Sequence, residues 1–196
     1  MNNYEYIISS LRALAPDFRS GGEDAFASVA QWVRGQCSQA DNALIDTLLE
    51  GFDGQSLGEG FYRGALRSGN RFIREYFAYD LRLRNAKAAF INKALGRPAG
   101  QDIFTPTPEG EEEFSAALSA PDALEREKAL DRLLWNKAEA INTFEYFSID
   151  AILGYLARLR LASRWARLDP ERGKELFHRL LGDLRASGPE IRYDEK

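Results

Sequence analysis

The stretch GNRFIREYFAYDLRLRNAKAAFINKAL, residues 69–95, decides the fold. Its apolar residues recur at steps of three and four, the spacing that places side chains on one face of an α-helix. This face comprises Phe72, Ile73, Tyr76, Phe77, Leu83, Ile91 and Leu95. We expect Ser68 to cap the helix, and Gly96 followed by Pro98 to end it. A helix of this length predicts a protein built by helix–helix packing.

The residues before this helix predict three more helices, at about 23–37, 39–50 and 59–67. Ser38 can cap the second of them. The first segment, 4–14, is ambiguous, because its apolar residues fit both a strand alternation and a helical spacing, and Pro16 ends it in either case.

Downstream of the long helix, capping patterns predict the remaining helices. Thr107-Pro108-Glu109 is typical of a first turn, and Ser119 to Asp122 predicts the start of a helix that ends near 141. Asn142-Thr-Phe-Glu145 resembles a capping box and predicts an apolar helix to about 167. Asp169-Pro170-Glu171 predicts the last helix, and the charged tail 189–196 is expected to be frayed.

These elements predict an all-α bundle of about seven helices in a single domain, 1–196. The segment 97–107 contains Pro98, Gly100 and Pro106 and has no periodicity. It is therefore the best candidate for a linker between two helical sub-units, 1–96 and 108–188.

A motif recurs with an offset of 70 residues. Glu75-Tyr76-Phe77-Ala-Tyr-Asp80 returns as Glu145-Tyr146-Phe147-Ser-Ile-Asp150. The recurrence indicates either two related helical units or a chance similarity between amphipathic helices.

The acids of this motif share the apolar faces of their helices, and a buried carboxylate needs a partner. Arg84 follows Asp80 by four residues, whereas the matching position after Asp150 is Gly154. We therefore predict that Asp150 pairs with an arginine or lysine of another helix. The pair would be either a structural ion pair of the bundle or a site for a partner's basic residue.

Composition excludes several classes of protein. Apolar residues make up 44% of the 196 residues and the net charge is −4, which indicates a folded domain and argues against nucleic-acid binding. One cysteine, Cys37, and one histidine, His178, cannot build a zinc site or an internal disulfide. No stretch has the length and apolarity of a signal peptide or a membrane span, so we expect a soluble cytoplasmic protein.

No nucleotide-binding loop, dinucleotide fingerprint or hydrolase motif occurs in the sequence. We therefore expect no enzyme activity, cofactor or metal. Trp165 lies between Arg164 and Arg167, which is typical either of an interaction surface or of a core tryptophan flanked by arginines. The candidate interface or buried polar residues are Glu75, Tyr76, Phe77, Asp80, Arg84, Asn85, Lys87, Glu145, Tyr146, Phe147, Asp150, Arg164, Trp165 and Arg167.

Four stretches resemble an uncharacterised bacterial family whose members tend to be encoded among the subunits of V-type (V/A-type) ATPases. They are NYEYIISSL (3–11), EYFAYDLRLRNAK (75–87), FSIDAILGYL (147–156) and RWARLD (164–169). The resemblance spans about 3–187 and implies a place like that of the C-type (or d-type) component, an all-helical funnel on the membrane rotor ring. That component has three related helical units, whereas this chain has room for about two.

Three hypotheses follow. The first, which the resemblance implies, is a non-catalytic accessory or central-stalk-like subunit of a V-type ATPase that contacts stalk or membrane-ring subunits. It would lie in the cytoplasm, or on the inner face of the membrane through the ATPase complex, and would not insert into the membrane itself. The second is a helical scaffold or regulatory binding module unrelated to the ATPase. The third is an enzyme with a carboxylate cleft between helices.

Overall fold

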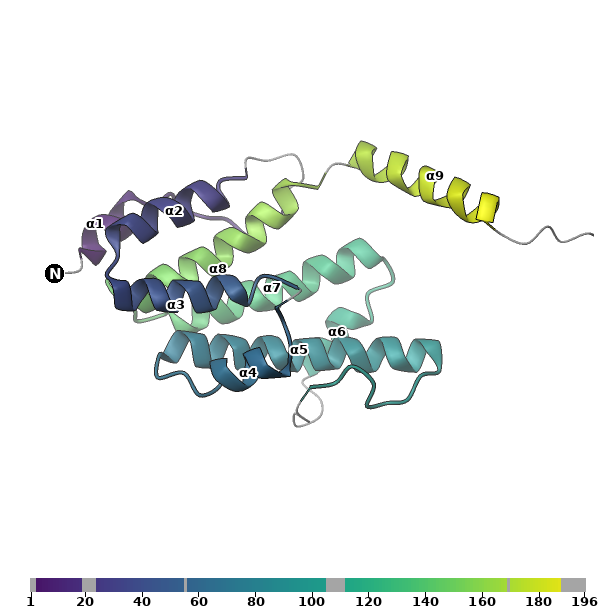
Figure 1. Ribbon diagram of the computed structural model, residues 1–196, viewed down its shortest axis with the longest axis horizontal. Coiled ribbons are helices and arrows are strands. Elements are labelled where there is room, and N and C mark those ends of the chain that lie inside the picture. The colour runs from purple at the N-terminus through teal and green to yellow at the C-terminus, as the bar shows by residue number, and fades with distance from the viewer. Residues whose placement is uncertain (1–2, 19–23, 55, 105–111, 169, 188–196) are drawn as a thin grey trace, which may run out of the picture.

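The computed structural model describes residues 3–18, 24–54, 56–104, 112–168 and 170–187, which form nine helices and no strand (Figure 1). The helices are α1 (Tyr4–Ser10), α2 (Phe26–Gln36), α3 (Gln39–Glu50), α4 (Glu59–Ala65), α5 (Arg71–Leu95), α6 (Glu112–Leu118), α7 (Ala123–Ile141), α8 (Ile149–Ala166) and α9 (Pro170–Ser187). The predicted all-α bundle is confirmed, and the ambiguous first segment is helical.

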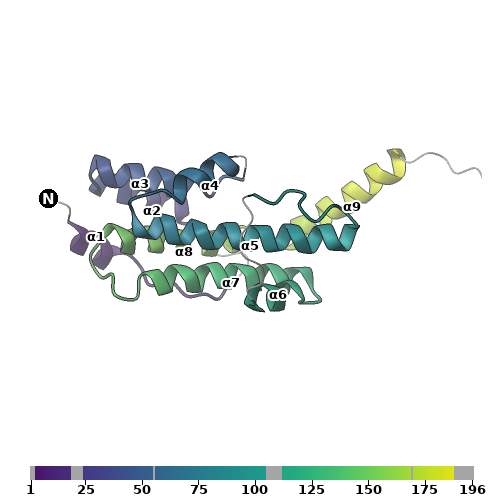
Figure 2. The same ribbon diagram turned by 90° about the horizontal axis from the view of Figure 1, so that it is seen from below.

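Helices α5, α7 and α8 form the centre of the bundle, and each of them packs against the other two. Helices α1, α2 and α3 pack on α8, while α4 packs on α5 (Figure 2). The short helix α6 lies against both α5 and α7. The long helix predicted from the opening stretch is therefore the element around which the layers assemble.

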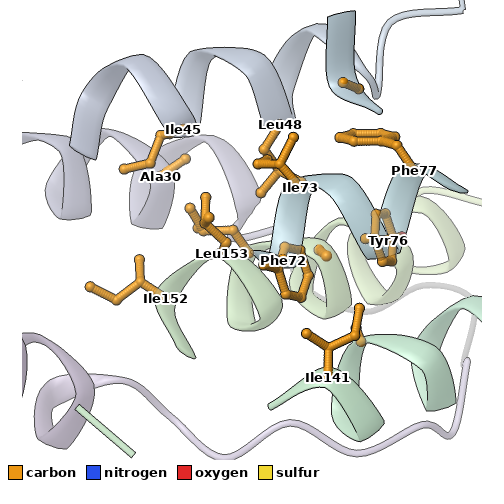
Figure 3. Packing of buried hydrophobic residues seen from close by; sticks show 14 of the residues in the cluster. Ala30, Ile45, Leu48, Phe72, Ile73, Tyr76, Phe77, Ile141, Ile152 and Leu153 are labelled. Carbon is orange, nitrogen blue, oxygen red and sulfur yellow. The ribbon is translucent and has the colours of Figure 1, made fainter. Parts of the chain in front are cut away.

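The main core forms where the first half of α5 meets α3 and α8. Ile73 of α5 lies beside Leu48 of α3, Phe72 of α5 lies beside Leu153 of α8, and all four side chains are fully buried (Figure 3). The same cluster contains Ile141 of α7. Residues from both sides of the predicted linker 97–107 thus share one core.

Most helix ends lie where the sequence predicts them. Ser38 caps α3 in a reciprocal box with Asp41, and Asp122 caps α7. The cap of α5, however, is Asn70 and not Ser68, because the Asn70 side chain accepts the hydrogen bond of the Ile73 amide. The Ser68 hydroxyl instead accepts a hydrogen bond from the Asn70 backbone.

The predicted capping box at Asn142 is wrong. Helix α7 continues to Ile141, so Asn142 is its C-cap, and α8 begins only at Ile149 with Ser148 as its cap. The Asn142 amide donates to the carbonyl of Asp150 at 3.0 Å. This residue therefore closes the turn between two helices and does not open the second one.

The segment after α5 turns back and is held to this helix by two buried asparagines. Gly96 has φ +62°, the left-handed conformation that glycine adopts without strain, and it ends α5 as predicted. Asn92 donates to the carbonyl of Gln101 at 2.7 Å, and Asn85 donates to the carbonyl of Phe104 at 2.8 Å. We call residues 97–104 the return segment. The predicted caps at Thr107 and Asp169 and the tail 189–196 lie outside the described residues.

Helix α9 projects away from the bundle (Figure 1). Its side chains Leu176, Phe177 and Leu180 are 41%, 60% and 57% exposed. His178 is also on this exposed helix, beside Phe177. The last helix thus has an apolar face that the bundle does not cover.

Candidate interaction site

Asp80 of α5 lies in a polar cluster beside the return segment. The Tyr62 hydroxyl donates to its carboxylate at 2.6 Å, and the Arg84 guanidinium lies over the ring of Phe104 at 4.9 Å. Desolvation raises the pKa of Asp80, while the hydrogen bond from Tyr62 and the charge of Arg84 oppose this rise. Asn85 completes the cluster, because its carbonyl oxygen accepts from the Phe104 amide at 3.2 Å. These residues connect α4, α5 and the return segment.

Trp165 and its arginines belong to a second polar cluster, between α7 and α8. The Trp165 indole is buried and donates to the carboxylate of Asp131 at 2.6 Å. Arg164 pairs with the same carboxylate at 2.7 Å and with Glu127 at 3.5 Å, and Lys87 of α5 also pairs with Glu127. Trp165 is therefore a core residue. Arg167, at the end of α8, pairs with Asp24 at 3.3 Å.

Asp131 was not a candidate from the sequence, although it lies at the centre of this cluster. Its burial raises the pKa of its carboxyl, while Arg164 and the Trp165 indole oppose the rise. Its position on the buried face of α7 was the signal in the sequence that could have identified it.

The predicted pairing of Asp150 with a basic residue is wrong. Its carboxylate accepts a hydrogen bond from the Asn70 amide, the residue that caps α5. No ion pair joins it to a lysine or arginine of the described residues within 4 Å. Asp150 lies in the first turn of α8, where the helix dipole favours a negative charge. The hydrogen-bond partner of Asp150 is therefore an amide, and Arg71 of α5 acts on its charge only from beyond ion-pair distance.

The two copies of the recurring motif have different structures. Tyr76 and Phe77 are buried within α5, whereas Tyr146 and Phe147 are exposed in the connection between α7 and α8. Arg71 links the two stretches, because it pairs with Glu75 at 2.9 Å and lies 4.0 Å from Glu145. The similarity in sequence thus does not correspond to equivalent positions in the fold.

The exposed copy belongs to a cluster of aromatic side chains, which we call the aromatic turn. Its members are Phe144, Tyr146 and Phe147, with exposed fractions of 84%, 68% and 56%. Aromatic residues at interfaces bury about 150–250 Å² each, so three of them offer several hundred Å² of largely apolar surface. Exposed apolar surface of this extent marks interaction sites. Phe144 was missed by the sequence, because the expected helix 142–167 placed it in regular structure.

A groove of about 690 Å³ runs between α5 and α6. Apolar side chains provide most of its lining, including Phe90, Phe114 and Leu118. No pattern in the sequence predicts this groove, because it depends on how far α6 extends along α5. Its size is in the range of ligand and peptide sites.

A second pocket, of about 450 Å³, is the candidate for a carboxylate cleft, because Glu139 and Glu145 are among the residues that line it. Glu139, however, pairs with Arg158 at 3.0 Å, so the two carboxylates do not converge clearly on a reaction centre. Within the described ranges, no group of three or more His, Cys, Asp or Glu side chains is placed to hold a metal ion. Burial raises the pKa of the Cys37 thiol to about 11, which disfavours the nucleophilic thiolate.

None of the helices that the structure describes is long and apolar enough to cross a bilayer.

The fold and these surfaces define a helical-bundle protein with exposed apolar surfaces. Comparison with protein families finds one match over residues 113–187, to a family described as "Protein of unknown function (DUF2764)". The matched residues cover less than half of the chain and include almost all of α6 together with α7, α8 and α9. Neither the curated proteins nor the solved structures contain a match to this chain.

Proposed function

We infer that the protein is a non-catalytic accessory subunit of a V-type ATPase, resembling a central-stalk component, and that the aromatic turn is its main contact. The choice of a V-type ATPase as the partner rests on the resemblance of residues 3–187 to proteins encoded with such ATPases. The single observation that carries the assembly role is the exposure of Phe144, Tyr146 and Phe147 on one connection. Three aromatic side chains in water are costly unless a partner covers them.

The polar clusters suit a subunit that transmits force by contact. Asp80 joins α5 to α4 through a hydrogen bond, and Asp131 joins α7 to α8 through a hydrogen bond and an ion pair. Such bonds restrict the movement of α4 against α5 and of α7 against α8. A stalk component needs this rigidity, because movement within it would weaken the coupling of ATP hydrolysis to ion transport.

The test is affinity purification of the tagged protein from its native host in gentle detergent, with mass spectrometry of the recovered proteins. We expect ATPase stalk or membrane-ring subunits with the wild type. The double variant Phe144→Ser/Phe147→Ser should lose at least four-fifths of this recovery. Leu168→Ser is the matched control, because Leu168 is also exposed, at 44%, but lies outside the aromatic turn.

Two outcomes would contradict the proposal. Recovery of no ATPase subunit with the wild type would remove the ATPase role and leave the helical scaffold as the better hypothesis. Equal recovery with the wild type and the double variant would show that the aromatic turn is not the contact. Circular dichroism of the double variant serves as the control for folding, because exposed side chains contribute little to stability.

A further inference from the structure

Helix α9 carries an apolar stripe that the bundle leaves exposed. Leu176, Phe177 and Leu180 are one, three and four residues apart, so their side chains lie on one face of the helix. Their exposed fractions are 41%, 60% and 57%. An amphipathic helix buries such a face against another apolar surface. The stripe therefore requires a surface of matching size and character.

The groove between α5 and α6 is a surface of this kind. Its α5 side spans residues 82–94, about 18 Å at 1.5 Å per residue, whereas the seven residues of α6 cover only about 10 Å. Ala86 and Ala89 are small and allow a backbone to approach closely, and Phe90 and Phe114 provide apolar walls. Helix α9 has 18 residues, about 27 Å, so it is long enough to fill the groove.

The groove of the same chain is on the wrong side of the bundle for α9. In both views α7 lies between α8 and α6 (Figures 1 and 2). The chain is held to the end of α8 as far as Leu168, whose amide donates to the carbonyl of Trp165 at 3.0 Å, and α9 begins at Pro170. A connection of one residue is too short to lead α9 around α7. A second molecule is free of this restriction.

The area that can be buried favours an exchange between two molecules. If a fully exposed leucine or phenylalanine offers about 150–200 Å², the three side chains of the stripe offer roughly 300 Å² at their exposed fractions. The groove would lose a similar area, so one contact buries roughly 600 Å² and two contacts bury roughly 1,200 Å². Stable interfaces begin at about 1,200 Å², whereas contacts below about 800 Å² are typical of crystal packing. Only the paired contact reaches the area that a stable dimer needs.

We propose that two copies of this protein form a dimer in which α9 of each copy packs into the α5–α6 groove of the other. The start of α9, the end of α5 and α6 lie toward the same end of the bundle (Figures 1 and 2). A twofold axis beside this end brings both pairs of surfaces together and closes the assembly at two copies. The aromatic turn is a separate surface, so the dimer does not depend on the ATPase.

The oligomeric state of the full chain gives the first test. Sedimentation equilibrium over a dilution series should show a dimer of twice the 22.1 kDa chain. Leu176→Ser/Leu180→Ser should weaken the dimer by roughly a hundredfold or more, because four leucines per dimer lose their contacts. Ala89→Trp, which fills the groove, should also produce monomers. Lys174→Ser/His178→Ser is the matched control on the other face of α9 and should dimerise like the wild type.

Cross-linking tests which surfaces meet. In a Cys37→Ser background, one chain carries Gly173→Cys, on the same face of α9 as the stripe, and a second chain carries Ala89→Cys in the groove. A short bismaleimide should join the mixed chains into a heterodimer. Ala43→Cys, at an exposed position of α3, replaces Ala89→Cys in the control and should give little product. A chain with both Gly173→Cys and Ala89→Cys reports closure within one molecule.

Several results would overturn the proposal. A chain that stays monomeric at every concentration has no such dimer. A dimer that tolerates both Leu176→Ser/Leu180→Ser and Ala89→Trp uses other surfaces, as does equal cross-linking to Ala43→Cys. A cross-link within the chain that carries both cysteines would show that α9 covers its own groove, and open-ended polymers would exclude the reciprocal exchange. Circular dichroism checks the fold of each variant. None of these results bears on the ATPase proposal, which recovery of ATPase subunits tests.

Discussion

The contacts around Gly154 predict that its substitution by alanine destabilises the protein, whereas helix propensity alone would predict a gain in stability. Gly154 lies buried in the interior of α8, where alanine is more favourable than glycine by about 1 kcal/mol. A β-carbon at this position would nevertheless lie 1.9 Å from Nδ2 of Asn142 and 3.1 Å from Cε2 of Phe72. Asn142 would have to rotate and give up its hydrogen bond to the carbonyl of Asp150.

The magnitude follows from these contacts. A buried amide that loses its partner costs about 1–3 kcal/mol, and the Asn142 carbonyl oxygen is already buried without a hydrogen bond. Overpacking against Phe72 adds about 1 kcal/mol. After subtraction of the gain in helix propensity, Gly154→Ala should destabilise the protein by about 1–3 kcal/mol.

The assay is urea unfolding followed by circular dichroism. Gly35→Ala is the matched control, because Gly35 is also helical and a β-carbon there would meet no atom within 4 Å. This control should stabilise the protein by up to about 1 kcal/mol. In an Asn142→Ala background, the cost of Gly154→Ala should fall, since the main clash is gone. A change of stability in the same direction for Gly154→Ala and Gly35→Ala would show that the contact with Asn142 does not limit the size of residue 154.

Two further predictions concern the polar contacts of α5. Asn85→Ala should leave the amide and carbonyl of Phe104 without partners, destabilise the protein by about 2–4 kcal/mol and speed hydrogen exchange at Phe104; wild-type exchange would contradict the role of the return segment. Asp80 has its pKa raised above 3.8, so its folded carboxyl retains a proton that the unfolded chain releases, and its contribution to stability falls as pH rises from about 3.8 through the raised pKa. Asp80→Asn removes this loss, so the variant should gain stability relative to the wild type as the pH rises over that range. The measurement is urea unfolding of both proteins at several pH values. Parallel pH profiles of the two proteins would show that Asp80 does not titrate differently in the folded and unfolded chains.

The sequence was sufficient for most features that depend on neighbours in the chain, although it placed the cap of α5 at Ser68 and not at Asn70. The bounds of α3, its Ser38 cap and the end of α5 at Gly96 follow from contacts between residues one to five positions apart. The apolar spacing also identified Phe72 and Tyr76 as residues of a buried face. These features are local, so the sequence contains all the information they need.

Local sequence patterns gave wrong predictions where a residue distant in the chain contacts the polar side chain concerned. Asn142 has a capping-box pattern, but packing against Gly154 and the Asp150 carbonyl fixes it as the end of α7. The partner of Asp150 is Asn70, 80 residues away in the chain, and no spacing rule reaches that far.

The candidate sites divide in the same way. The sequence determined that the protein is a bundle of amphipathic helices, and it singled out Tyr146 and Phe147. Helix packing sets the rest: these side chains face water, Trp165 is buried, and α6 leaves a groove along α5. The reason is physical: helix formation is governed by neighbours within one or two turns, whereas exposure is set by which helices come to lie together.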